Sequence, residues 1–284
     1  MRQVRWPTSV SIVRVFLRRF AHKTGSKGEA SLKKLTTKSE REYSALIRQI
    51  QRKYNIFKPN QLVLDLGCAP GYWNRYAASH VKPFGRVIGL DVVPCHVDRN
   101  SSFLQGSFLS SGVQHELIRM AVRAQQLRDV KQVGSSKDYA TILTELQHSE
   151  DMYTKLSYSD VQVDVVLSDL MAPLPRNAPF EPRFVRNAYK TMLLSKQLAV
   201  DSCKDSILLA HAALVLCFRS LKQSGIFVCK VLRGDETFAF RDNLLLTFET
   251  VHQVSCFRDP QARSQTVFIC FGKREELPIG LINT

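Results

Sequence analysis

Short apolar runs alternate with helix-length amphipathic stretches along most of this chain. Seven runs rich in Val, Ile, Leu and Phe predict β-strands, at residues 61–66, 86–91, 102–105, 163–168, 225–231, 250–256 and 265–271. The first five are mostly separated by helix-length segments, so we expect crossover connections and parallel pairing. The last two are joined by a short polar turn and could form a hairpin, which would make the final strand antiparallel. The pattern therefore predicts an α/β fold with a doubly wound, mostly parallel seven-stranded sheet.

Segments outside this pattern divide the rest of the chain. Residues 29–60 are polar with apolar residues at helical spacing, which predicts an N-terminal helix that packs on the domain and stops at Lys58-Pro59-Asn60. The sheet domain is expected over residues 61–275, followed by a tail at 276–284. The stretches 110–160 and 184–223 are longer than a minimal domain requires, and we interpret them as insertions. The first contains a helical run from Val113 to Leu127.

The first 28 residues contain no Asp or Glu and carry seven basic residues interleaved with apolar ones. An Arg-rich, acid-poor amphipathic helix is typical of a mitochondrial transit peptide. We therefore expect a protein of the mitochondrial matrix. The alternative is a basic RNA-binding arm that the mature protein keeps. Arg14 interrupts the apolar run that a secretory signal needs, and no apolar stretch reaches the length of a membrane span, so no membrane partner is expected.

The net charge of the chain indicates what kind of partner it binds. The chain of 284 residues has 40 Lys and Arg against 25 Asp and Glu, a formal net charge of +15. Such an excess favours a polyanionic partner such as RNA, through release of counterions and long-range attraction. Each candidate for phosphate contact is as readily an ordinary solvated surface charge; the candidates are Lys33, Lys34, Lys38, Arg41, Arg48, Lys53, Arg75, Arg233 and Arg241.

The seven cysteines are scattered and form no C-x-x-C pair. Several lie in apolar runs such as Phe227-Val228-Cys229. They are typical of small buried hydrophobic residues in a reducing compartment, and we predict neither a metal site nor a disulfide framework.

The segment from Val63 to Trp73 is the clearest candidate for chemistry. It predicts a buried strand, a turn with Gly67 and Gly71, and the start of a helix. The next strand ends in Asp91, where an acid can accept hydrogen bonds from ribose hydroxyls. The G-x-G-x-x-G spacing of pyrophosphate sites is absent, so an adenosine ligand without pyrophosphate is favoured, and S-adenosylmethionine is the commonest. The alternative is an ordinary strand-to-helix turn.

Two further charged residues belong to predicted strands. Asp169 follows the strand at 163–168, and Lys230 lies inside the apolar strand at 225–231. Ligands of open α/β sheets bind beyond the carboxyl ends of the strands, so both side chains should face the same cleft as Gly71 and Asp91. A lysine in a buried strand is costly unless it is paired, and Asp169 is the natural partner. A purely structural ion pair is the alternative.

At these residues the chain resembles the FtsJ-like ribosomal RNA 2′-O-methyltransferases, especially their mitochondrial members. The matching motifs run in family order from about residue 57 to the fifth strand: Phe57-Lys58-Pro59, Asp65-Leu66-Gly67, Ala69-Pro70-Gly71, Trp73, Asp91-Val92-Val93-Pro94, Phe103-Leu104-Gln105-Gly106, Ser168-Asp169, Ala172-Pro173 and Phe227-Val228-Cys229-Lys230-Val231. The resemblance implies the Rossmann-like methyltransferase fold and S-adenosylmethionine as cofactor. It also implies ribosomal RNA as partner, with the large subunit favoured, in a ribosomal precursor particle. The insertions could contact assembly factors.

The resemblance also assigns roles to single residues. In the family a Lys-Asp-Lys-Glu set positions and activates a ribose 2′-hydroxyl, and the resemblance implies that Lys230 and Asp169 are its central, catalytic pair. The cofactor-binding residues that it implies are Gly67, Pro70, Gly71, Trp73, Asp91, Ser107 and Asp169.

The departures from the family are as informative. The first lysine of the set falls at Leu46 and the glutamate at Thr266. Ser107 replaces an acid, and Tyr72 replaces a small residue. Two hypotheses follow: an active ribosomal RNA 2′-O-methyltransferase that works with Lys230 and Asp169, or a non-catalytic assembly factor that keeps the fold to bind ribosomal RNA. A methyltransferase for small molecules or proteins is a minor third, because it leaves the basic charge unexplained.

Overall fold

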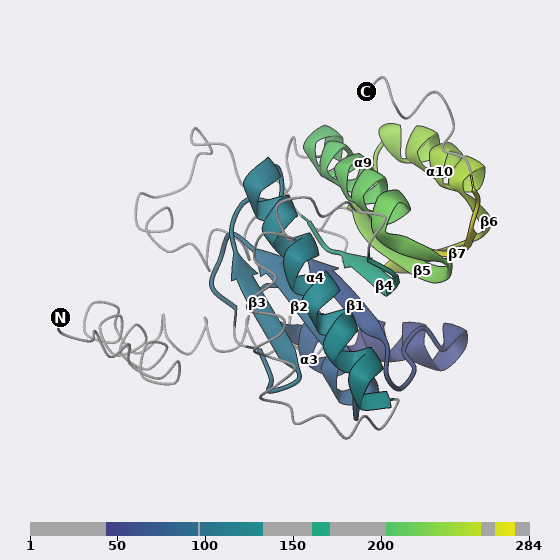
Figure 1. The fold of residues 1–284 in the computed structure, drawn as a ribbon. Coiled ribbons are helices and arrows are strands. Elements are labelled where there is room, and N and C mark those ends of the chain that lie inside the picture. Colours follow the sequence, from purple (N-terminus) through teal and green to yellow (C-terminus); the bar gives the residue numbers. More distant parts are fainter. Residues whose placement is uncertain (1–43, 96, 133–160, 171–202, 257–264, 276–284) are drawn as a thin grey trace, which may run out of the picture. The chain divides into compact units, whose positions relative to one another are not determined.

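The computed structural model describes residues 44–95, 97–132, 161–170, 203–256 and 265–275 (Figure 1). The chain divides into two compact units, residues 1–49 and 50–284. The described strands all belong to the second unit, which is therefore the part that carries the sheet and its site. The predicted leader at 1–28, the tail at 276–284 and the turn at 258–260 lie outside the described residues.

The second unit is built on one seven-stranded sheet in the order β3-β2-β1-β4-β5-β7-β6. Strands β1 to β5 pair in parallel, whereas β7 pairs antiparallel with both β5 and β6. The predicted α/β fold with a doubly wound, mostly parallel sheet is confirmed, as is the hairpin of the last two strands. The bounds are Leu62–Leu66 (β1), Arg86–Asp91 (β2), Ser101–Gln105 (β3), Val163–Ser168 (β4), Leu221–Leu232 (β5), Phe248–Cys256 (β6) and Gln265–Lys273 (β7).

Helices cover both faces of this sheet (Figure 1). Helix α3 (Tyr72–His80) lies on one face, and α4 (Ser111–Gln132), α9 (Cys203–Ser220) and α10 (Glu236–Thr247) lie on the other. The larger core forms between the sheet and these last three helices. Side chains alternate along a strand, so Phe227, Cys229 and Val231 enter this core while Lys230 points to the face of α3.

Two of these helices occupy the stretches that we interpreted as insertions. Helix α4 follows β3 and precedes β4, and α9 precedes β5, which is where parallel pairing requires crossover helices. Both contribute buried residues to the core, among them Leu117 and Leu214. Residues 111–132 and 203–220 are therefore part of the basic fold, and the remaining parts of the expected insertions lie outside the described residues.

The helix expected over residues 29–60 is described from residue 44, and it ends at Tyr54, four residues before the predicted stop. Asn55 adopts a left-handed backbone conformation with φ of 49°, and its N–H donates to the carbonyl of Gln51. An asparagine in this conformation ends a helix much as glycine does. The stop therefore comes from Asn55, not from Lys58-Pro59-Asn60. No described helix is long and apolar enough to cross a membrane.

Candidate active site

The turn after β1 makes a tight backbone contact with the end of β4. Gly67 has a φ of 77°, and a Cβ added there would lie 2.7 Å from the carbonyl oxygen of Asp169. The Gly67 N–H donates to Leu90 at 2.8 Å, and the Asp169 N–H donates to Leu66 at 2.9 Å. Only a glycine has both the conformation and the room that this position requires. The turn is thereby held against β2 on one side and β4 on the other.

Gly71 begins the next element of the site. Its φ of 99° places it in the left-handed region as the residue that caps α3. Its N–H donates to the carbonyl of Cys68, and the peptide bond between Ala69 and Pro70 is cis. Gly71 is buried and Pro70 is half-buried. The sequence prediction that glycines let the backbone turn sharply here agrees with these conformations.

Asp91 lies at the carboxyl end of β2 and faces this turn. Its Oδ2 accepts a hydrogen bond from the Ala69 N–H, and its Oδ1 accepts one from the Val93 N–H, both at 2.9 Å. A carboxylate has about four acceptor positions, so both oxygens keep capacity for a further donor. The two backbone bonds orient the side chain, and its half-buried position leaves it accessible to ribose hydroxyls.

Asp169 and Lys230 form an ion pair between the ends of β4 and β5. The ammonium of Lys230 contacts Oδ1 of Asp169, and the lysine is only 1% exposed. Burial of a charge pair is unfavourable, because both ions lose their hydration. Their mutual attraction offsets this cost only when the geometry is good. Such a pair at the ligand-binding edge of an α/β sheet is a candidate for chemistry.

The surroundings of Lys230 exclude water. Its ammonium lies 5.9 Å from the ring centroid of Trp73, which projects from the first turn of α3 and is itself buried. On the other side, burial raises the pKa of Cys229 to about 12, so its thiol stays neutral beneath the pair. A cation between an aromatic face and a carboxylate is held in one place, as a group that must orient a substrate has to be.

The structure joins most of the predicted site residues through direct contacts. Asp91 contacts Ala69, Gly67 contacts Asp169, Asp169 contacts Lys230, and Lys230 lies near Trp73. Ser107 lies two residues beyond β3 at the same edge and is exposed. Tyr72 is half-buried with its ring 5.5 Å from the guanidinium of Arg75.

The two residues that the resemblance places at departures from the catalytic set, Leu46 and Thr266, are both buried. Leu46 is buried in the helix at residues 44–54. Thr266 lies on β7 opposite Val231, next to the register partner of Lys230, and its hydroxyl has no hydrogen-bond partner among the described residues. Neither side chain carries a charge that could assist Lys230.

One contact of the site has no signal in the sequence. Asn74 in α3 is fully buried, and a Cβ added at Gly89 of β2 would lie 2.9 Å from its Nδ2. Gly89 therefore lets α3 approach the sheet beneath the cofactor turn. A glycine within a strand indicates such an approach in general, but not which residue makes it. Among the described residues, no cluster of His, Cys, Asp or Glu has the arrangement of a metal site.

The FtsJ-like methyltransferase family matches this sequence over residues 47–273, which includes every residue of the site described above except Leu46. The chain belongs to the FtsJ-like methyltransferase family. Its cofactor is S-adenosylmethionine, and the site fits this group, since Gly67 and Gly71 turn the backbone sharply after β1 and Asp91 keeps acceptor capacity at the tip of β2.

Proteins similar to this chain occur in several organisms. A Schizosaccharomyces pombe protein named as a ribosomal RNA methyltransferase is 34% identical over 251 residues, covering 88% of this chain and 83% of the relative. The mitochondrial rRNA methyltransferase 2 of Saccharomyces cerevisiae is 27% identical over 256 residues, covering 81% and 80%. Among solved structures, a ribosomal RNA methyltransferase of Plasmodium falciparum aligns with 81% of this chain and 96% of its own, at 17% identity and a TM-score of 0.49.

Proposed function

We propose that this protein transfers a methyl group from S-adenosylmethionine to a ribose 2′-hydroxyl of ribosomal RNA, with Lys230 and Asp169 as the catalytic pair. The observation that carries the proposal is the buried ion pair of these two residues, at the same edge of the sheet as Asp91 and the glycine turn. The names of the relatives support ribosomal RNA as the substrate. The net charge of +15 supports it independently, because it favours a polyanion.

The residues divide the work between donor and acceptor. Gly67, Pro70 and Gly71 would bring backbone against the cofactor, Asp91 would bind its ribose hydroxyls, and Trp73 and Ser107 would flank it, with the backbone of Asp169 beside Gly67. S-adenosylmethionine supplies a methyl group already activated by its sulfonium. Most of the acceleration therefore has to come from alignment of the 2′-hydroxyl with that methyl.

Lys230 performs this alignment by donating a hydrogen bond to the oxygen of the 2′-hydroxyl. Asp169 holds the ammonium in position and places a carboxylate next to the proton that leaves. The ribose oxygen would gain the methyl group and pass its proton to the Asp169 carboxylate, while the electron pair of the broken carbon–sulfur bond would stay with the cofactor. Trp73 covers the lysine and keeps bulk water from competing for the methyl group.

Methyl transfer from tritiated S-adenosylmethionine to mitochondrial large-subunit ribosomal RNA, free or in a precursor particle, tests the proposal. We expect incorporation at a ribose by the wild-type protein and none by Lys230→Ala. Absence of transfer to every mitochondrial ribosomal RNA and particle would refute catalysis. Calorimetric titration with S-adenosylmethionine separates the two halves of the site: Asp91→Ala should lose binding, whereas Lys230→Ala should keep it.

The compartment is part of the same proposal. An acid-free, basic, amphipathic segment at residues 1–28 supports a transit peptide and a place in the mitochondrial matrix. The mitochondrial name of the Saccharomyces cerevisiae relative agrees with it. Fusion of residues 1–28 to a fluorescent protein should direct it to the matrix with removal of the segment. A diffuse signal in the cytoplasm would refute the transit peptide.

A second function is favoured by Leu46 and Thr266. The resemblance places both at positions of the family's catalytic set, and neither side chain carries a charge. A protein without these groups could retain the fold as a ribosome assembly factor that binds ribosomal RNA, with its insertions facing other factors. Under this function, Lys230→Ala would support normal ribosome assembly in cells that lack the wild-type protein. An assembly defect of this variant, when it is stably folded, would favour the enzyme.

A further inference from the structure

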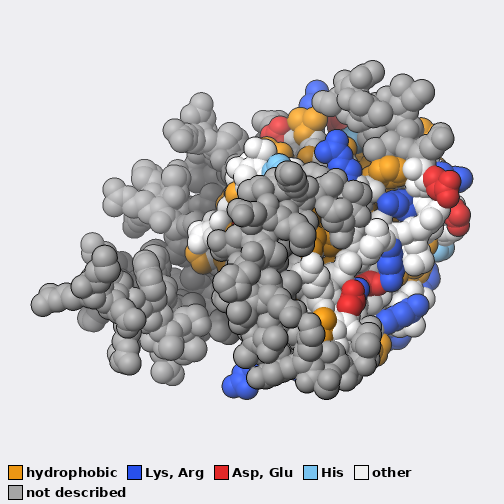
Figure 2. Space-filling model, viewed as in Figure 1, with side chains coloured by type: hydrophobic (Ala, Val, Ile, Leu, Met, Phe, Trp, Pro, Cys, Tyr) orange, Lys and Arg blue, Asp and Glu red, His pale blue; other side chains and the backbone are white. Residues whose placement is uncertain are grey.

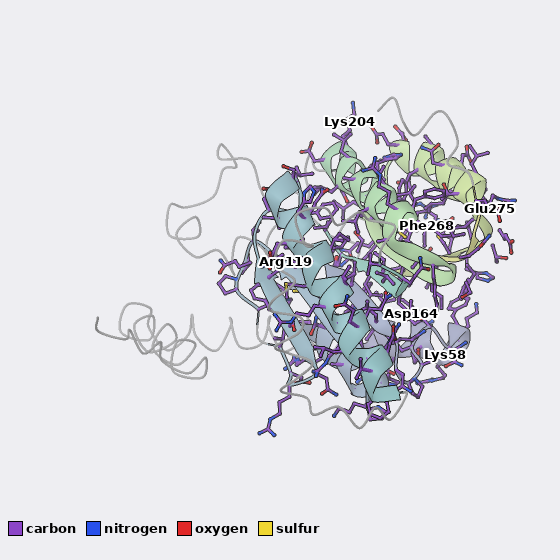
Figure 3. All side chains as sticks on the ribbon, viewed as in Figure 1. Lys58, Arg119, Asp164, Lys204, Phe268 and Glu275 are labelled. Atoms are coloured by element: carbon purple, nitrogen blue, oxygen red, sulfur yellow. The ribbon has the colours of Figure 1, made fainter. Side chains whose placement is uncertain are left out.

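A pocket of about 510 Å³ lies at the edge of the sheet opposite the active site. Its walls come from the loop that precedes β1, from the last turns of α4, and from the first residues of β4 and β5. Figure 3 labels Lys58 and Asp164 in this region, and Figure 2 shows Lys and Arg side chains gathered around a smaller acidic area there. The volume is in the range of small-ligand sites, about 300–1,000 Å³.

The charged side chains that line the pocket have an excess of two positive charges. The cations are Lys58, Arg128 and Lys222, and the one acid is Asp164. Oδ2 of Asp164 accepts hydrogen bonds from the Leu62 N–H at 2.7 Å and from Arg128 at 2.9 Å, and its Oδ1 pairs with the ammonium of Lys222. Protein donors thus occupy three of its roughly four acceptor positions. It positions two of the cations, Arg128 and Lys222, in the wall of the pocket.

The amide side chains of the pocket also face it as donors. Oδ1 of Asn60 accepts a hydrogen bond from the Phe84 N–H at 3.1 Å, and Oε1 of Gln61 accepts one from the Lys58 N–H at 2.6 Å. These bonds engage both amide oxygens within the protein, and each side chain also has an NH₂ group that can donate to a ligand. Ser224 adds a hydroxyl. A cavity that offers ammonium, guanidinium, amide and hydroxyl donors is complementary to an anion with several oxygens.

We propose that this pocket binds a phosphate group of RNA, at the edge of the sheet opposite the methyl-transfer site. A guanidinium and two ammonium groups suit the geometry and charge of phosphate. The net charge of +15 makes the phosphates of RNA the expected source, although a free nucleotide offers the same chemistry. The RNA would then contact the protein at two edges of one sheet, and the pocket would contribute to affinity without contact to the reacting ribose.

Binding of a fluorescein-labelled ribosomal RNA hairpin, followed by anisotropy across a salt series, tests the proposal. Lys222→Gln should weaken binding several-fold and reduce the slope of log K against log salt by about one phosphate contact. Lys204→Gln is the matched control: its side chain is 80% exposed on α9, and Figure 3 shows it far from Lys58 and Asp164. Equal weakening by both variants would mean a general charge effect and would overturn the proposal.

A second variant guards against a structural effect of Lys222→Gln on Asp164. Lys58 is exposed on the loop before β1, so Lys58→Gln removes a pocket charge and leaves the ion pairs of Asp164 in place. It should weaken RNA binding as Lys222→Gln does, with an unchanged melting temperature. Normal RNA binding by a folded Lys58→Gln protein would overturn the proposal.

Titration with inorganic phosphate and with adenosine monophosphate at constant ionic strength distinguishes the two sources. If Lys58→Gln loses binding of both small anions and also weakens RNA binding, the pocket is a phosphate site used by RNA. If the small anions bind to the wild-type protein but RNA binding does not depend on Lys58 or Lys222, the ligand is a free nucleotide and the RNA contact is refuted. Absence of both effects refutes the phosphate site.

RNA binding at this pocket can be tested separately from methyl transfer. Lys58→Gln should leave affinity for S-adenosylmethionine unchanged, because Lys58 lies at the edge of the sheet opposite the cofactor turn. If the protein never transfers a methyl group but still binds RNA through Lys58 and Lys222, the proposed catalysis fails and the pocket stands.

Discussion

Strands β4 and β5 carry an aspartate–lysine ion pair at each of their two ends, and the pairs differ in almost everything except composition. At the carboxyl end, Asp169 pairs with Lys230, which is 1% exposed. At the amino end, Asp164 pairs with Lys222, whose side chain is 38% exposed. The first pair is removed from water beneath Trp73, whereas the second lies in the wall of an open pocket.

The difference lies in how each carboxylate is satisfied. Asp164 also accepts hydrogen bonds from Arg128 and from the first N–H of β1, so it contributes to the structure at three points. Asp169 and Lys230 are desolvated at the edge of the sheet where ligands of this fold bind. This location favours a functional role for the pair over a contribution to stability. Identical residue types on the same two strands therefore have different roles, and burial distinguishes them.

The largest effect is expected from Lys230→Met. It should lower single-turnover methyl transfer by at least about 100-fold, because the hydroxyl loses its orienting group. It should also destabilise the fold by about 3–5 kcal/mol, because Asp169 is left buried without its cation. The double variant Asp169→Asn, Lys230→Met should regain most of the stability in urea unfolding but none of the activity. If the double variant recovered both stability and activity, the pair of Asp169 and Lys230 would have a structural role only and would not differ in role from the pair of Asp164 and Lys222.

The next effect is expected from Asp164→Ala. This variant leaves the Leu62 N–H without its acceptor and leaves the half-buried Arg128 with Asp129 as its only acidic partner among the described residues, so we expect a loss of about 3–5 kcal/mol in the free energy of unfolding. Urea denaturation at neutral pH measures it. Binding of S-adenosylmethionine per folded molecule should not change, since the cofactor turn is at the opposite edge. A loss of cofactor affinity in folded protein would contradict the separation of the two edges.

Gly67→Ala should cost about 1–3 kcal/mol of stability, because a Cβ at φ of 77° is strained and would lie 2.7 Å from the Asp169 carbonyl. It should also weaken cofactor binding, measured by calorimetry. Gly112→Ala, in helix α4, is the matched control, since the nearest atom to its added Cβ is 4.0 Å away; it should leave cofactor binding unchanged and should not lower stability. Normal affinity in Gly67→Ala would show that the turn does not approach the cofactor.

The smallest effect is expected from Lys222→Gln. A partly exposed ion pair contributes about 0–1 kcal/mol, because solvent and salt screen it. Thermal and urea unfolding should therefore barely change, in contrast to Lys230→Met. A loss as large as that of Lys230→Met would make the two pairs equivalent. This stability is also what makes the RNA-binding measurement with Lys222→Gln interpretable.

The sequence predicted the central strands well and their margins less well. Strands β2 and β4 have the predicted bounds, because strands buried on both faces are continuous apolar runs. Strand β5 begins at Leu221, four residues before the predicted start. The polar run Lys222-Gln223-Ser224 interrupts the apolar pattern, so nothing in the sequence indicated that these residues belong to the strand. The crossover helices α4 and α9 were interpreted as insertions, since length alone does not separate a required helix from an added one.

The two ion pairs show which parts of a site a sequence reveals. Lys230 was predicted because a charge within an apolar strand is conspicuous and needs a partner. The cluster at Asp164 was missed, because Arg128 comes from a helix 36 positions earlier and charges at the start of a strand are common on protein surfaces. The contact between Asn74 and Gly89 was missed for the same reason: it depends on how a helix lies over a strand, which spacing does not encode.

The close approach of Gly67 to the Asp169 backbone has a consequence for the evolution of such proteins. This glycine is demanded by the packing of two strand ends, whether or not any nucleoside is ever bound. A descendant that gave up methylation would still be selected to keep it. The glycine motif thus reflects the packing of the fold. If a lineage lost activity, substitutions would appear first at positions such as Lys230, because the fold does not need this lysine once Asp169 is neutralised.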